Sequence, residues 1–140
     1  MQWPTTTGEV LQQEGQVRQA VAHYQKALDL RPDFAPACNR LAWILATSPD
    51  ASVRNGVRAV GLAEGAQRLS GGGHPGVVAT LAAAYAEAGR FPEAIETAKS
   101  ALELAAAQNR TAQADRLRRQ ITLYQAGLAY RDAGRADNDL

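Results

Sequence analysis

Residues 82–104, AAAYAEAGRFPEAIETAKSALEL, contain two helical patterns separated by a short turn. The first runs from Ala82 to Ala88 and the second from Pro92 to Leu104. Gly89 interrupts the first pattern because glycine readily leaves the helical conformation. Pro92 suits a first helical turn, where an amide hydrogen is not needed. This stretch therefore predicts two helices joined as a hairpin.

Small residues recur where these two helices must approach each other. Ala94, Ala98 and Ala101 follow one another at steps of three and four residues, so they share one face of the second helix. Large residues suited to fill the remaining space are Tyr85, Phe91, Ile95 and Leu102. The pattern predicts a closely packed helix pair.

The spacing of the small residues, the aromatic residue and the glycine resembles the tetratricopeptide repeat, whose period is about 34 residues. The same spacing recurs in QAVAHYQKALDLRP at residues 19–32 and in LAWILAT at residues 41–47. The resemblance covers roughly residues 8–130, and the second half is similar to C-terminal modules of larger bacterial repeat proteins. It implies an all-α solenoid of three helix hairpins plus a C-terminal capping helix, seven helices in total.

In this frame the chain is one domain, 1–140. Repeat 1 covers about 1–34, and Gly15 is expected to end its first helix. Repeat 2 covers about 35–74. It contains an insertion at 47–56, because the alanines expected on its second helix stand five residues further along the sequence than the repeat spacing predicts. Asn55 can cap the helix that follows the insertion. Repeat 3 covers about 75–108. The capping helix covers about 111–131, with Thr111 as its cap and Leu128 on its apolar face, and the residues beyond Arg131 are expected to be a frayed polar tail.

Composition supports the all-α class and limits the partners. The 140 residues are 46% hydrophobic and only 6% aromatic, which suits close-packed helices better than a sheet. Lys plus Arg number 15 against 14 for Asp plus Glu, so we expect no nucleic-acid partner and no membrane surface. No apolar run reaches the length of a membrane span. The single cysteine favours a reducing compartment, and therefore a cytoplasmic location.

Candidates for chemistry are few, and we expect no enzyme, no metal site and no cofactor. Cys38 is interpreted as a small buried hydrophobe, and His23 as a solvated helix residue. The segment SGGGHPG, which contains His74, lacks the ending of a phosphate-binding loop and is interpreted as a linker. The basic cluster of Arg116, Arg118 and Arg119, with Arg110 nearby, is interpreted as a solvated face rather than a nucleic-acid site.

The resemblance implies a function as a non-enzymatic scaffold that binds a protein or peptide. In this family the first helix of each hairpin lines an inner groove. The corresponding positions here are Asn39, Arg40, Trp43, Ala46, Ala79, Thr80, Ala83, Ala86 and Glu87. Small residues at 79 and 83 exclude the basic pair that some family members use to hold a peptide carboxylate, so an apolar or extended peptide is favoured. Trp43 can serve as an aromatic anchor in the groove or pack beneath the insertion, and packing is favoured.

The N-terminal end is a candidate surface for self-association. It offers an apolar edge without a polar cap, and such an edge commonly binds a partner. The residues of this edge are Trp3, Val10, Leu11, Val17 and Val21. A homodimer would bury it, and missing upstream repeats are the competing explanation. Two further functions remain open: a structural or self-associating C-terminal segment of a larger repeat protein, and a regulatory subunit of an enzyme.

Overall fold

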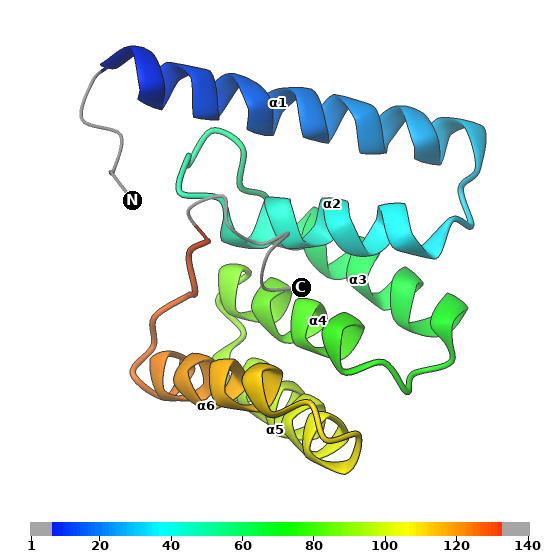
Figure 1. Cartoon of the computed structure of the whole chain (residues 1–140), viewed down its shortest axis with the longest axis vertical. Helices are drawn as coiled ribbons and strands as arrows, with labels where there is room; N and C mark the ends of the chain where they lie inside the picture. Colours follow the sequence, from blue (N-terminus) through cyan, green and yellow to red (C-terminus); the bar gives the residue numbers. More distant parts are fainter. Residues whose placement is uncertain (1–6, 133–140) are drawn as a thin grey trace.

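The computed structural model describes residues 7–132 of the chain, with side chains described from Gly15 onward. Within this range the chain forms six helices and no strand. They are α1 (Thr7–Leu30), α2 (Ala35–Thr47), α3 (Gly56–Ser70), α4 (Pro75–Glu87), α5 (Phe91–Ala107) and α6 (Thr111–Gln125). Each helix packs against the next along the chain, and α4 also packs against both α2 and α6 (Figure 1). The all-α solenoid expected from the sequence is confirmed.

The first hairpin is not formed, which corrects the expectation of seven helices. α1 runs without a break from Thr7 to Leu30 and passes through Gly15. A glycine inside a helix costs only about 1 kcal/mol relative to alanine, and good helix formers flank it on both sides. At the predicted turn between α4 and α5, by contrast, Gly89 has a φ of +81° and Pro92 follows it. No proline follows Gly15, so nothing forces the chain to turn there.

Three consecutive helices end in the same hydrogen-bonded turn. A residue with positive φ follows α4, α5 and α6 in turn: Gly89, Asn109 and Gly127. The amide of the next residue then donates to a carbonyl five residues back, for example from Leu128 to Leu123 at 2.9 Å. This turn ends α6 at Gln125, so the prediction that the capping helix continues to about residue 131 was wrong.

Of the two predicted helix caps, the cap of α3 is confirmed and the cap of α6 is corrected. The side chain of Asn55 accepts a hydrogen bond from the backbone amide of Arg58 at 3.1 Å, which confirms the predicted cap of α3. Thr111 is instead the first residue of α6, and Arg110 occupies the cap position without a side-chain bond. Thr111 therefore does not cap this helix.

The core consists largely of alanines, as the spacing predicts. Ala59, Ala63 and Ala66 of α3 are completely buried, and so are Ala94, Ala98, Ala101 and Ala105 of α5. Small side chains let neighbouring helices approach closely without strain. The larger residues Tyr85, Phe91, Ile95 and Leu102 are partly buried around these alanines.

Candidate functional site

The ends of α2 and α4 lie together and form the best candidate for a site. Both are first helices of a hairpin, so they run in the same direction, and they pack against each other. Gly56, at the start of α3, makes a close approach to the end of α4. A Cβ added at Gly56 would lie 2.7 Å from the backbone nitrogen of Ala88. Only glycine fits here, and this contact holds Glu87, the last residue of α4, beside the loop that leads into α3.

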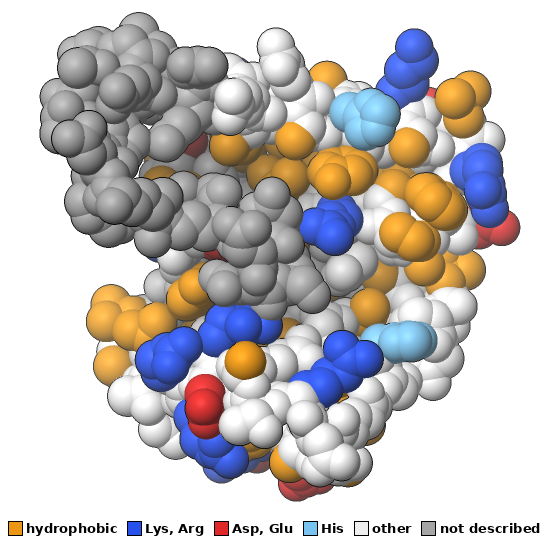
Figure 2. All heavy atoms as spheres, viewed as in Figure 1, with side chains coloured by type: hydrophobic (Ala, Val, Ile, Leu, Met, Phe, Trp, Pro, Cys, Tyr) orange, Lys and Arg blue, Asp and Glu red, His pale blue; other side chains and the backbone are white. Residues whose placement is uncertain are grey.

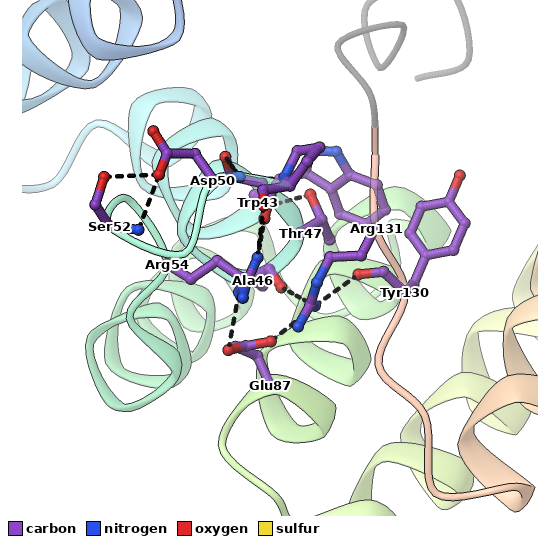
Figure 3. Close-up of polar contacts among 11 residues, drawn as sticks. Trp43, Ala46, Thr47, Asp50, Ser52, Arg54, Glu87, Tyr130 and Arg131 are labelled. Atoms are coloured by element: carbon purple, nitrogen blue, oxygen red, sulfur yellow. Dashed lines mark hydrogen bonds and ion pairs between the residues drawn. The ribbon is translucent and has the colours of Figure 1, made fainter. Parts of the chain in front are cut away.

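The loop between Thr47 and Gly56 occupies the range of the predicted insertion and is internally bonded. The Asp50 carboxylate accepts hydrogen bonds from the Ser52 amide at 2.9 Å and from the Ser52 hydroxyl at 2.7 Å. These bonds hold the pKa of Asp50 below its usual range. Arg18 of α1 reaches across to the Asp50 carboxylate at 3.3 Å, which joins α1 to this loop. The loop is therefore an ordered wall of the site (Figure 3).

Glu87 lies between two arginines from different parts of the chain. Its carboxylate is 3.4 Å from Arg54 Nε of the loop and 2.8 Å from an Nη atom of Arg131, which follows α6. Arg54 also donates to the carbonyls of Ser48 at 2.7 Å and Pro49 at 3.0 Å, just beyond the end of α2. Cations near a helix C-terminus are favoured because the exposed carbonyls there carry partial negative charge. Figure 3 shows the two guanidinium groups converging on Glu87.

Trp43 is buried, with 6% of its surface exposed, and the segment after α6 contacts it. Its indole nitrogen donates to the Asp132 carboxylate at 2.8 Å. Its ring lies 5.8 Å from the ring of Tyr130, tilted by 44°. The favoured prediction that Trp43 packs rather than stands open agrees with this burial. Tyr130 and Asp132 contact its rings directly, and Val53 of the insertion packs against the same core cluster.

The other predicted groove positions differ widely in exposure. Arg40 is exposed and Asn39 is half-buried. The side-chain oxygen of Asn39 is buried without a hydrogen-bond partner among the described residues. The remaining positions are buried in the packing of α2 and α4: Ala46, Ala79, Thr80, Ala83 and Ala86. Of the predicted set, Trp43 and Glu87 therefore both contact the segment 128–132.

Sequence reasoning missed the residues that complete the site. The sequence indicates for Arg54 only a place in the insertion at 47–56, and for residues 130–132 only the end of a helix and the start of a frayed tail. One local signal was present, because Gly127 after an apolar helix is a common helix stop. No sequence pattern indicated where the chain would go after that stop.

The predicted self-association edge is only partly visible. Trp3 lies outside the described residues, and the side chains of Val10 and Leu11 lie in the undescribed part of α1. Val17 and Val21 are half-buried, and Val21 packs against the core cluster that contains Trp43. These contacts leave self-association as a prediction.

The other candidates for chemistry are accounted for by ordinary structural roles. Cys38 is buried, as interpreted from the sequence, and burial raises the pKa of its thiol. Arg118 pairs with Asp115 at 2.7 Å on α6. Figure 2 shows the basic side chains of one face in separate small groups, with uncharged or acidic side chains between them. Among residues 7–132 no group of three metal-ligating side chains comes together, and no helix is long and apolar enough to cross a membrane.

Comparison with known proteins gives one match. Residues 7–34 match the family model of the tetratricopeptide repeat, over α1 and the turn that leads to α2. No curated protein and no solved structure matches the chain. The matched range folds here as one helix and a turn, and the paired helices α2–α3 and α4–α5 follow it. Residues 7–34 are therefore similar to a tetratricopeptide repeat, and the chain continues beyond them as an all-α helical solenoid.

Proposed function

We propose that this chain is a non-enzymatic scaffold that binds an extended segment of a partner protein at the ends of α2 and α4. Tetratricopeptide repeats typically bind proteins or peptides, and residues 7–34 match the model of this repeat. The observation that carries the proposal is the docking of the chain's own residues 130–132 at this place. That segment binds through both its backbone and its side chains, as an added peptide would.

The site has the chemistry that peptide recognition uses. Trp43 supplies a large aromatic surface with one hydrogen-bond donor, and aromatic residues are enriched among the positions that carry binding energy. Glu87 supplies a negative charge that selects a basic side chain. Its carboxylate is already held by Arg54, so its position is fixed before a partner arrives. The near balance of charges in the chain favours a protein partner over nucleic acid or a membrane surface. We also propose a cytoplasmic location for this scaffold.

A screen of a random peptide library tests this function. The wild-type chain and a double variant with Tyr130→Ala and Asp132→Ala would each be presented to the library. Selected peptides would then be measured by calorimetry against Glu87→Ala and, as a matched control, Glu103→Ala on the exposed face of α5. We expect Glu87→Ala to weaken binding and Glu103→Ala to leave it unchanged. Selected peptides that bind Glu87→Ala as tightly as Glu103→Ala would refute the proposed site.

Self-association along α1 is a second candidate, favoured by the packing of that helix. Among the described residues, α1 packs chiefly against α2. Leu30 at its end is 76% exposed. A second copy could cover this helix by a twofold axis. Sedimentation at micromolar concentration should then show a dimer that Leu11→Asp or Val17→Asp dissociates, and a strictly monomeric wild type would refute this candidate.

A further inference from the structure

The segment 128–132 crosses from one end of the solenoid back to its middle. The turn at Gly127 ends α6 and redirects the chain, and Figure 1 shows the following residues stretched past α4 toward the end of α2. Asp132 and Trp43 are 89 positions apart in the sequence, yet they share a hydrogen bond. Residues 128–132 therefore bind to a surface built entirely from other parts of the chain.

This segment completes the hydrogen bonding at the end of α2. The last carbonyls of a helix have no partner within the helix. Here the Leu45 carbonyl accepts from the Asn55 amide at 2.9 Å. The next two carbonyls are served by the docked segment: Ala46 accepts from the Arg131 guanidinium at 3.5 Å, and Thr47 accepts from the Asp132 amide at 2.8 Å. Any extended peptide carries an amide that could replace the second of these bonds.

Side chains of the docked segment give the contact its selectivity. Tyr130 packs against two core clusters at once, one containing Trp43 and the other containing Tyr124. Arg131 pairs with Glu87, and Asp132 accepts the indole hydrogen of Trp43. The three consecutive positions thus present an aromatic ring and a carboxylate to Trp43, and between them a guanidinium to Glu87.

The receptor groups are arranged so that the segment can leave. The side chain of Arg131 is 37% exposed and that of Glu87 is 17% exposed, so Arg131 lies on the solvent side of this pair. When Arg131 departs, Glu87 keeps Arg54 as its partner, so no isolated charge is left behind. The Trp43 nitrogen and the Thr47 carbonyl would then be reached by water from the side that the segment vacates. Departure therefore has no large electrostatic penalty.

We propose that residues 128–132 are a tethered occupant of the partner site, and that the partner displaces them with an extended segment of the same chemistry. That segment presents an aromatic residue, an arginine and an aspartate in succession. This inference rests on the proposed function, because it names the partner class of the same site. A tethered ligand acts at an effective concentration in the millimolar range, so it keeps weak or unrelated peptides out. Binding of the correct partner would release residues 128–132.

Fluorescence and peptide binding together test the proposal on the full chain. The probe is a labelled peptide with the sequence of residues 127–132, GLAYRD, blocked at both ends. The receptors are the wild type, the Tyr130→Ala/Asp132→Ala double variant that weakens the occupant, and Glu103→Ala, on the exposed face of α5, as the control outside the site. All three carry Trp3→Phe, so Trp43 is the only indole. Circular dichroism verifies that each variant is folded, and Asp132→Ala alone replaces the double variant if that one unfolds.

We expect the peptide to bind the double variant about tenfold or more tightly than the wild type. Glu103→Ala should resemble the wild type. The emission of Trp43 should shift to the red in the double variant and return when the peptide binds. A peptide with Glu in place of Arg should not bind the double variant, but it should bind when Glu87→Arg is added.

Three results would overturn the proposal. Equal binding to the wild type and the double variant would show that the occupant does not compete. Failure of the peptide to bind any folded receptor would show that the sequence of the occupant does not define the partner. The proposed function would still hold in that case if the library screen yields unrelated peptides whose binding Glu87→Ala weakens. A wild-type dimer that the free peptide dissociates would assign the docked segment to a second copy of the chain.

Discussion

Replacing Gly56 by alanine should destabilise the protein, although the same change elsewhere in the same helix should stabilise it. A Cβ at Gly56 would lie 2.7 Å from the nitrogen and 2.9 Å from the Cα of Ala88, and 2.8 Å from the carbonyl carbon of Glu87. All three atoms belong to the backbone of the α4 end, which cannot rotate away as a flexible side chain can. The start of α3 and the end of α4 must therefore separate.

The magnitude follows from comparing two glycines of α3. Overpacking a well-packed contact costs about 1–3 kcal/mol of unfolding free energy. Gly61 has open space where its Cβ would lie, so Gly61→Ala should gain about 0.5–1 kcal/mol from helix propensity alone. The two variants should consequently differ by roughly 1.5–4 kcal/mol, with opposite signs relative to the wild type.

Urea denaturation followed by far-ultraviolet circular dichroism measures both free energies. Gly56→Ala should also displace Glu87 from its two arginines, so Trp43 emission in a Trp3→Phe background should shift to the red for Gly56→Ala and remain unchanged for Gly61→Ala. If Gly56→Ala proves as stable as the wild type or more stable, the close approach of α3 and α4 is not a constraint, and our explanation of the position of Glu87 fails.

Three further predictions concern other parts of the chain. Gly15→Ala should stabilise by about 0.5–1 kcal/mol because α1 is continuous there; destabilisation in the same urea assay would indicate a turn at this position. Ala94→Leu should cost about 1–3 kcal/mol because Ala94 is completely buried between helices, whereas Ala107→Leu, at an exposed helix end, should cost less, and equal losses would contradict the packing face. Hydrogen bonds from Ser52 lower the folded pKa of Asp50, so their contribution to stability is present above the unfolded pKa and is lost as the pH falls through the folded value. A carboxyl titration by NMR at an unshifted pKa would contradict this, and Asp50→Asn should remove this part of the pH dependence.

Features governed by neighbours in the sequence could be predicted. The hairpin of α4 and α5 follows from Gly89 and Pro92, and the cap of α3 follows from Asn55. The buried alanines follow from their helical spacing, because residues three or four positions apart share a helix face. Each of these signals acts within about one turn of helix, so a single sequence is sufficient to detect it.

The corrections also have physical causes. Gly15 alone does not end α1, because a glycine tolerates the helical conformation at a cost of about 1 kcal/mol and no proline follows it. The end of α6 at Gln125 was missed because the apolar spacing continues to Leu128 although Gly127 adopts a positive φ. In both cases the tendency of a glycine to end a helix competes with the helical pattern of its neighbours, and the sequence pattern does not show which of the two is stronger.

Local sequence patterns predict the helical class, the small-residue packing faces and the placement of Trp43 and Glu87 on first helices of hairpins. The contacts of these two residues, in contrast, depend on the tertiary structure. Arg54 reaches Glu87 because Gly56 lets α3 abut α4, and Asp132 reaches Trp43 because the chain turns back after α6. Contacts between residues so far apart depend on how whole helices stack, and no periodicity along the chain encodes the partner at the other end.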